Sequence, residues 1–402
     1  MNTKHKLNTE YFKSILPDIL AIDSPTGFTA AVTQYLRTAV DKIGYKTSLT
    51  NKGNLVVKIP GRTDEGAVGI SAHVDTLGLC VRGYKGDGTL GFSNIGGPIM
   101  PTLDGEYCKI YTRCGEVYTG TILSNSPAVH VFDDAKDLKR DAQNMHVKLD
   151  EEVKTADDVK KLGILPGDFI CFDTKTQITK TGFIKSRFLD DKLGAAIILS
   201  VLRYLKDNDL TPANDVYAIF STYEEVGHGL SHLPVPLSEF VAVDMGCIGS
   251  DLTCTEYDVS ICAKDSSGPY DYELTTRLIN LAKKAELSFA VDIYPHYGSD
   301  VSAARRAGHD IRGGLIGPGV AASHGMERSH IKAAENTFAL LCLYHHHTMY
   351  KNNQSKMLPF KRSDFPLNLD AFTCGSNLCN KPIHHKPPVL KVCTIPIIKM
   401  IR

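Results

Sequence analysis

The spacing of apolar and polar residues along the chain predicts an α/β protein. Apolar side chains recur at helical spacing from about Thr29 to Ile43 and again over 191–207. The runs 54–59 and 67–75 are short and mostly small or apolar, as buried strands are. Strands that alternate with helices in this way imply a mostly parallel, mixed sheet with helices on both faces.

The same alternation continues in the second half of the chain. It predicts strands that begin the stretches 215–227 and 239–246, a helix over 272–287, a strand near 311–317 and a closing helix over 335–345. The ends of parallel strands lie along one edge of such a sheet, where ligands bind.

The region between these two α/β parts has a different sequence pattern. From about Leu79 to Phe172, short strand-like pieces such as "EYCKIYT", "EVYTGTIL" and "DFICFD" alternate with Gly-rich turns. We therefore expect a small β-rich domain over 79–177, inserted into an α/β domain made of 1–78 and 178–344.

The amino-acid composition limits the class of protein and its partners but does not indicate a function. A chain of 402 residues with 43% hydrophobic and 22% charged residues is an ordinary globular protein that can hold two domains. Its formal net charge is zero, so we expect neither a nucleic-acid nor a membrane partner. The stretch 351–402 differs, with nine Lys or Arg, two Asp or Glu and six of the 19 prolines. We expect 345–402 to be a Pro-rich, basic and poorly ordered tail.

Targeting and redox signals favour the cytoplasm. The N-terminal residues hold no uninterrupted apolar run, so we predict neither a signal peptide nor a membrane helix. The 11 cysteines are an odd number without paired spacing, which favours reduced thiols.

Side chains that bind metal ions gather at the ends of the predicted strands and at one helix start. Four strands end in, or are followed by, Asp, Glu or His, and a pair of adjacent carboxylates opens the helix over 191–207. The candidates are His73 and Asp75, Asp190 and Asp191, Glu224 and Glu225, Asp244, and His324. Two His and three carboxylates are what two neighbouring divalent cations need, with a further Glu left over as a base.

Each of these motifs also has a simpler explanation. The pair Asp190–Asp191 before a helix is more often a cap that complements the helix dipole. The pair Glu224–Glu225 is usually a solvated pair, and an isolated "HVD" is seldom a metal site. Their joint order favours the metal site, because each follows a buried strand or opens a helix.

Five motifs in order resemble the co-catalytic metalloaminopeptidases, in particular the tetrahedral (TET-type), glutamyl-aminopeptidase-like family. They are "SAHVDTLG", "RFLDDKLGAA", "STYEEVG", "VAVDMG" and "ASHGMER", supported by "DSPTGFT", "NKGNLVVKIPG" and "GSDVSAARRAG". The resemblance covers about residues 10–344. It implies an inserted PDZ-like domain that drives dimerisation, and dimers that assemble into a dodecamer.

The resemblance also implies the metal ligands. Asp190 is expected to bridge two divalent metal ions, Zn or Co, with Mn as a third candidate. His73 and Asp244 are expected to complete one ion, and Glu225 and His324 the other.

The remaining residues receive roles around the metals. Glu224 matches the general base that activates a water shared by the two ions, and Asp75 matches the residue that orients His73. Asp191 is expected to support the turn without binding metal. The implied activity is release of N-terminal residues from peptides, with Glu224 returning the proton to the leaving amine.

The last ligand departs from the family pattern. Many members have Arg-Tyr-hydrophobic-His-Ser-Pro where this chain has "AASHGMERSH". His324 directly follows a predicted strand and is the preferred ligand, with His330 as the fallback. The altered loop also leaves the preferred N-terminal residue open.

Two other functions fit the same motifs. A related metal-dependent amidohydrolase or deacylase would share the site, whereas a glucanase activity fits less well because paired-carboxylate glycosidases need no metal. A non-catalytic assembly protein of the same fold is the third alternative. The complete set of ligands and base argues against it.

Overall fold

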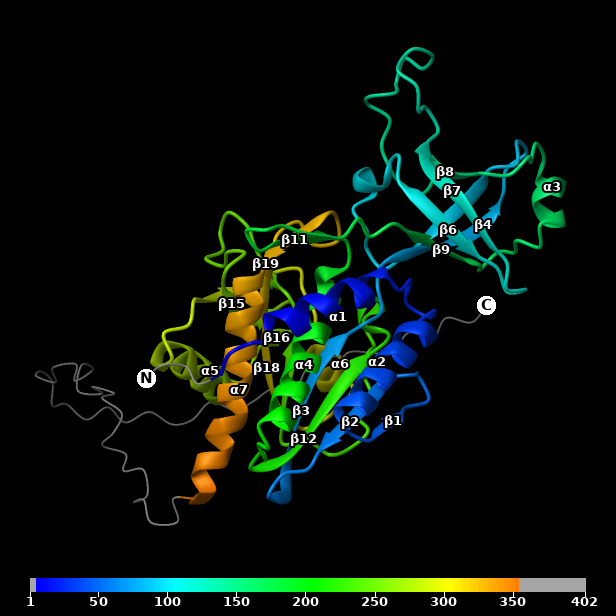
Figure 1. Ribbon diagram of the computed structural model, residues 1–402. Coiled ribbons are helices and arrows are strands. Elements are labelled where there is room, and N and C mark those ends of the chain that lie inside the picture. Colours follow the sequence, from blue (N-terminus) through cyan, green and yellow to red (C-terminus); the bar gives the residue numbers. More distant parts are fainter. Residues whose placement is uncertain (1–4, 354–402) are drawn as a thin grey trace, which may run out of the picture. The chain divides into compact units, whose positions relative to one another are not determined.

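A ten-stranded mixed sheet forms the centre of the molecule (Figure 1). The structure, a computed structural model, describes residues 5–353, and their side chains up to His345. The strand order is β1-β2-β12-β3-β13-β18-β15-β16, with β14 paired to β18 and β17 to β15. The strands are β1 (Thr47–Leu49), β2 (Leu55–Ile59), β3 (Thr63–His73), β12 (Asn214–Ser221), β13 (Glu239–Val243), β14 (Gly246–Cys247), β15 (Val259–Asp265), β16 (Gly268–Pro269), β17 (Phe289–Ile293) and β18 (Arg312–Val320).

The middle of this sheet is parallel. Strand β3 pairs in parallel with both β12 and β13, and β13 pairs in parallel with β18. The pairs β2–β12 and β15–β18 are antiparallel, so the sheet is mixed. The carboxyl ends of β3, β12 and β13 therefore meet at one edge.

Helices bury both faces of the sheet. One face packs against a large apolar core formed with α1 (Thr9–Ala21), α2 (Ala30–Ile43), α4 (Leu189–Asp207), α5 (Tyr272–Lys284) and α7 (Ile331–Asn353). A smaller core on the other face includes Val301 and Ala304 of α6 (Asp300–Arg306) together with Leu230, Leu233 and Leu237. Helix α4 is the most deeply buried over its first turns, because every residue from Leu189 to Leu202 is buried.

The insertion between β3 and β10 is a closed six-strand barrel. Its strands lie in the order β4-β5-β8-β7-β6-β9. They are β4 (Gly78–Tyr84), β5 (Leu90–Ile95), β6 (Tyr107–Tyr111), β7 (Val117–Ser124), β8 (Met145–Leu149) and β9 (Phe169–Phe172), with η1 (Met100–Leu103) and α3 (Ala156–Lys161) in the connections. A third, small sheet joins β10 (Gln177–Ile178), β11 (Phe183–Ser186) and β19 (Glu327–His330).

Asp23 links the barrel to the α/β part. Its carboxylate accepts hydrogen bonds from Lys109 Nζ at 2.7 Å and from the Tyr111 hydroxyl at 2.6 Å. The Phe28 ring packs against Tyr111 and Phe169 of the barrel, with ring centroids 5.0 and 5.1 Å apart. The segment between Asp23 and Phe28 is thus fixed against the barrel.

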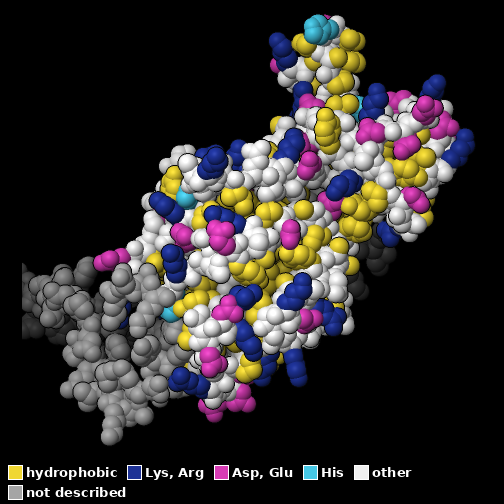
Figure 2. All heavy atoms as spheres, viewed as in Figure 1, with side chains coloured by type: hydrophobic (Ala, Val, Ile, Leu, Met, Phe, Trp, Pro, Cys, Tyr) yellow, Lys and Arg dark blue, Asp and Glu magenta, His cyan; other side chains and the backbone are white. Residues whose placement is uncertain are grey.

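The loop between β7 and β8 carries exposed apolar side chains. Val129 is 56% exposed, Val131 74% and Phe132 38%. Figure 2 shows hydrophobic side chains gathered on the projecting loop of this part of the molecule. An exposed apolar group of this kind is a candidate contact surface for another protein chain.

The predicted fold class is confirmed, with two additions to the predicted elements. Helix α1 was not predicted, although Phe12, Ile15, Leu16, Ile19 and Leu20 lie on its buried face at helical spacing; Pro17 interrupts this run. Helix α7 continues to Asn353, past the expected boundary at 344, and the rest of the expected tail, 354–402, lies outside the described residues. None of the helices in the described part of the chain is long and apolar enough to span a lipid bilayer.

Candidate metal centre

Strand ends deliver most of the candidate side chains to one edge of the sheet. His73 is the last residue of β3, and Asp244 directly follows β13. Glu224 and Glu225 open the short helix η2 (Glu224–Val226) just after β12. Because β3 pairs in parallel with both neighbours, with His73 opposite Ser221, these groups converge.

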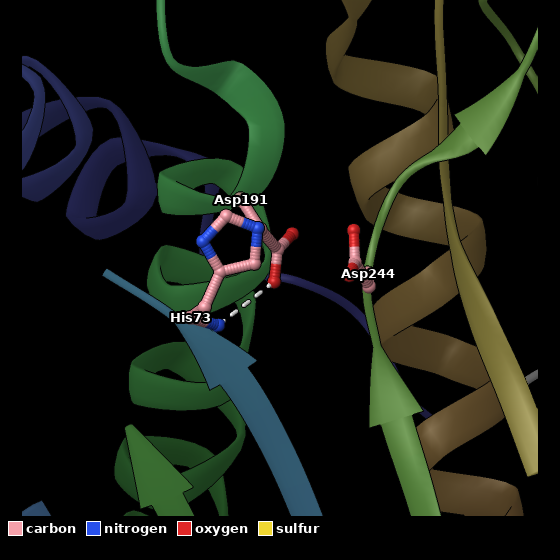
Figure 3. A group of neighbouring side chains, drawn as sticks. All are labelled: His73, Asp191 and Asp244. Carbon is pink, nitrogen blue, oxygen red and sulfur yellow. Dashed lines mark hydrogen bonds between the residues drawn. The ribbon is translucent and has the colours of Figure 1, made fainter. Parts of the chain in front are cut away.

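Asp190 and Asp191 reach the same edge from the start of α4. Both have non-helical backbone angles, so the regular helix begins only after them. The Asp191 carboxylate accepts a hydrogen bond from the backbone N–H of His73 at 3.3 Å (Figure 3). It packs over Gly194, where a Cβ atom would lie 2.4 Å from Asp191 Oδ1 and 2.3 Å from the Val243 carbonyl oxygen. The pair therefore faces the strand ends instead of serving only as a cap.

The side chains of all five predicted ligands lie together. His73 Nε2 is 3.0 Å from Asp190 Oδ1, and His324 Nε2 is 3.6 Å from Asp190 Oδ2. His324 Nε2 is also 3.6 Å from Glu225 Oε2. Asp190 thus stands between the two imidazoles, one at each carboxylate oxygen.

Two overlapping groups of ligand atoms are close enough to hold an ion. One atom each from His73, Asp190 and Glu225 lie within 4.8 Å of one another. The same holds for His73, Asp191 and Asp244, which Figure 3 shows side by side with Asp244 facing the pair from the end of β13. Asp191, expected only to support the turn, is therefore also in position to contribute an oxygen.

Backbone carbonyls orient both imidazoles. His73 Nδ1 donates to the carbonyl oxygen of Asp75 at 2.9 Å, and His324 Nδ1 donates to the carbonyl oxygen of Gly97 at 2.9 Å. Because a carbonyl can only accept, each Nδ1 must carry a proton. The Nε2 atoms are left facing Asp190, as metal-binding imidazoles require.

The Asp75 carboxylate fixes the Glu224–Glu225 turn. It accepts hydrogen bonds from the Thr26 hydroxyl at 2.6 Å and from the backbone N–H groups of Glu224 and Glu225 at 3.2 and 3.3 Å. Its own distance to His73 Nδ1 is 3.7 Å. Asp75 therefore orients His73 mainly through its backbone, whereas its side chain holds the two glutamates.

The cluster concentrates negative charge in a buried place. Burial, with the neighbouring Asp244, raises the pKa of Asp191 well above its usual range. Burial also raises the pKa of Glu224 and Glu225 well above their usual range, with Asp190 adding to the effect at Glu225. Burial, followed by the charge of Asp190, raises the pKa of Asp244 to about 7.

In the described part of the chain, the basic side chains within ion-pair distance of these carboxylates are histidines. Burial disfavours the His73 imidazolium, but its hydrogen bond with Asp190 and the nearby carboxylates hold the pKa of His73 well above its usual value. Burial likewise opposes the charge on Asp190, yet the bond with His73 leaves its pKa lowered. Among the residues that the structure describes, no Lys or Arg forms an ion pair with the carboxylates of this cluster.

Unpartnered oxygens show that the cluster suits metal ions. Glu225 Oε1 and Asp191 Oδ1 are buried and have no hydrogen-bond partner. A buried acceptor without a partner is costly, and a divalent cation would satisfy it. A donor set of imidazole nitrogens and carboxylate oxygens fits Zn, Co or Mn.

His330 lies outside this cluster. Its Nε2 donates to the Thr181 carbonyl oxygen at 2.8 Å, and its Nδ1 accepts from the backbone N–H of Lys332 at 3.0 Å. The ring packs against Phe183 and Tyr257, each with centroids 4.9 Å away. Both ring nitrogens are occupied by backbone groups, so His330 is a structural residue.

Sequence reasoning missed the residues that brace the Glu224–Glu225 turn. Asn54 Oδ1 accepts from the backbone N–H and hydroxyl of Thr222 at 3.1 and 2.8 Å, and its Nδ2 donates to the Gly229 carbonyl at 3.2 Å. The Asp300 carboxylate accepts from the Ser221 hydroxyl at 2.6 Å and from the Leu230 N–H at 3.1 Å. Asn54 lies in the motif "NKGN" and Asp300 in "GSDVS", and membership of these motifs is the sequence feature that could have pointed to them.

Known proteins resemble this chain over most of its length. The family model of the M42 glutamyl aminopeptidases matches residues 53–340. The chain is 43% identical to YhfE of Bacillus subtilis (strain 168) over 331 residues, which is 82% of this chain and 96% of that protein.

Solved structures match the fold at low sequence identity. A TET aminopeptidase from the marine sediment archaeon Thaumarchaeota archaeon SCGC AB-539-E09 superposes with a TM-score of 0.77 at 19% identity, covering 84% of this chain and 96% of that one. The structure of PhTET1-12s, a dodecamer in the asymmetric unit, gives a TM-score of 0.73 at 19% identity over 83% of this chain and 98% of that one.

Proposed function

This chain belongs to the M42 glutamyl aminopeptidase family, and from that premise we propose that it releases N-terminal residues from peptides with two divalent metal ions and Glu224 as the base. The observation that carries the proposal is the position of Asp190 between two imidazoles, with one carboxylate oxygen toward each. This is the arrangement that a carboxylate shared by two cations requires.

The proposed ligands divide into two sets around Asp190. His73 and Asp244 would complete one ion, and Glu225 and His324 the other. The 3.6 Å between His324 Nε2 and Glu225 Oε2 supports the second set, and the grouping of Asp244 with His73 supports the first, although Glu225 also lies within reach of His73. Zn or Co is the proposed metal, with Mn as a third candidate.

Glu224 is proposed to move the proton. When bound, the cations supply Lewis-acid chemistry that polarises the peptide carbonyl and lowers the pKa of water. The Glu224 carboxylate lies 3.8 Å from His73 Nε2, next to the ligands without being one of the five, and the Asp75 carboxylate holds its backbone. Burial raises its pKa well above the usual range, which makes its carboxylate a stronger base toward the attacking water.

A substrate panel tests the activity. Purified protein is assayed with aminoacyl amides and short peptides, and in parallel with N-acylated amino acids, before and after treatment with a chelator. The proposal expects hydrolysis of substrates with a free α-amino group, lost on chelation and restored by Zn²⁺ or Co²⁺. Hydrolysis of the N-acylated compounds alone would favour the deacylase alternative. A protein that binds metal and hydrolyses neither class would favour the assembly protein.

Assembly into dimers and then a dodecamer is also proposed. The fold it shares with the dodecameric PhTET1-12s and the exposed apolar side chains of the β7–β8 loop support it. Light scattering on the purified chain measures the mass directly. Val131→Asp should reduce the assembly if this loop is buried between copies, whereas an unchanged mass would exclude the loop from the interface.

A cytoplasmic location stays a prediction from the sequence.

A further inference from the structure

One buried carboxylate joins two segments that carry proposed metal ligands. Glu327, the first residue of β19, is only 3% exposed. Its Oε1 accepts a hydrogen bond from the backbone N–H of His324 at 3.0 Å, and its Oε2 accepts one from the backbone N–H of Asp190 at 3.0 Å. A single side chain therefore spans the loop after β18 and the start of α4.

His324 depends on such contacts for its conformation. Its φ of 65° lies in the left-handed region, which residues other than glycine seldom adopt unless their surroundings hold them there. Three hydrogen bonds hold it there. The His324 backbone N–H donates to Glu327, and the His324 carbonyl accepts from the Ile99 N–H at 3.0 Å. The His324 Nδ1 donates to the Gly97 carbonyl. Of the three, the bond to Glu327 is the one that also reaches Asp190.

We propose that Glu327 is a positioning residue of the metal centre, which sets the separation of Asp190 and His324 and thereby controls the ion these two share with Glu225. The inference rests on the proposed function, because it needs those three residues to be ligands. Glu327 is not itself a ligand, since each of its oxygens is taken by a backbone N–H. Groups that orient ligands in this way typically change metal affinity 10–100-fold when mutated.

A purely structural role makes a different prediction. Glu327 also lies opposite Ser186 in the pairing of β19 with β11, so its loss could weaken that sheet alone. Loosening of the sheet would lower thermal stability and leave the ratio of the two metal affinities unchanged. A positioning role weakens the ion near His324 more than the ion near His73.

The test is calorimetric titration of the metal-free 402-residue chain with Zn²⁺. Glu327→Gln keeps the size and one acceptor oxygen but turns an amide N–H toward a backbone N–H. Glu327→Asp keeps the charge but is one methylene too short to reach both N–H groups. Glu256→Gln is the matched control. Glu256 accepts a hydrogen bond at 2.6 Å from Nε of Arg328, the residue that follows Glu327, but it contacts neither His324 nor Asp190 through that bond. Thermal melts followed by circular dichroism establish that each variant is folded.

The wild type and Glu256→Gln should bind two ions. Both Glu327 variants should bind one of the two about 10–100-fold more weakly, with the other less affected. If Glu327→Gln does not fold, Glu327→Asp decides the result. Two ions bound by the variants as tightly as by the wild type would overturn the inference. A wild type that binds fewer than two ions would instead overturn the proposed function, and the inference with it.

Discussion

The carbonyl oxygen of Gly97 accepts a hydrogen bond from Nδ1 of His324 at 2.9 Å, across the boundary between the inserted barrel and the α/β part. The neighbouring Gly96 lies against Glu225, because a Cβ atom there would be 3.3 Å from the Glu225 carbonyl oxygen. Backbone that follows β5 thus touches two of the proposed ligands. The inserted barrel therefore helps to form the candidate centre itself.

Glu224→Gln should abolish hydrolysis while both metal ions remain bound. The amide keeps the shape of the side chain but cannot accept a proton, and general acid–base catalysis typically contributes about 10²–10⁴-fold to rate. Initial rates on an aminoacyl amide, with metal content from the same preparation, measure both properties. Activity within a few fold of wild type would show that another group is the base.

His324→Ala and His330→Ala should separate the two candidate ligands. The first removes an imidazole that faces Asp190 and Glu225, so one of the two ions should be lost or greatly weakened. The second removes hydrogen bonds to Thr181 and Lys332 but no ligand, so two ions should bind to a less stable protein. Metal analysis after gel filtration decides, and the reverse pattern would assign the ligand to His330.

Gly194→Ala should damage the centre from within α4. An added Cβ would lie 2.3 Å from the Val243 carbonyl oxygen and 2.4 Å from Asp191 Oδ1, so the helix or the carboxylate must move. Overpacking of this kind costs about 1–3 kcal/mol. Gly86→Ala is the control, since no atom lies within 4 Å of the Cβ it would add. Denaturant unfolding should show the loss only at position 194, and equal midpoints for both variants would contradict this packing.

The metal-free protein should lose stability as pH rises. The pKa of Asp244 moves from its ordinary 3.8 to about 7 on folding, so its contribution is fully present below about 4 and is lost between about 4 and 7. The raised pKa values of Asp191, Glu225 and His73 act with the same sign. The lowered pKa of Asp190 acts oppositely, but below 3.8.

Metal ions should reverse this trend, because deprotonated carboxylates are what bind them. The increase in Tm on adding Zn²⁺ should therefore be larger at about pH 8 than at about pH 5. Thermal melts across this range, with and without metal, measure it. A Tm of the metal-free protein that climbs steadily from pH 5 to 8 would contradict the charge balance described for the cluster.

The sequence predicted elements better than it predicted contacts. Apolar runs located β3, β12 and β13, and the polar residues just after them marked the edge where the candidate ligands meet. Hydrophobic patterning cannot show that β3 pairs between β12 and β13, because the buried part of each strand is mostly small or apolar. It is this order that brings His73 beside Glu224.

Contacts made by backbone groups could not be predicted from the sequence, for another reason. The carbonyl groups of Asp75 and Gly97 orient the two imidazoles, and every residue has such a carbonyl. Glu327 was visible three residues after His324, but its reach to the Asp190 N–H depends on how β19 meets α4. Such long-range geometry leaves no local pattern to find.

Anomalous diffraction from crystals grown with Zn²⁺ decides whether two cations share Asp190. Two peaks are expected, one in contact with His73 and Asp244 and one with Glu225 and His324, with the Asp190 carboxylate between them. A single peak, or peaks that do not contact Asp190, would contradict this sharing.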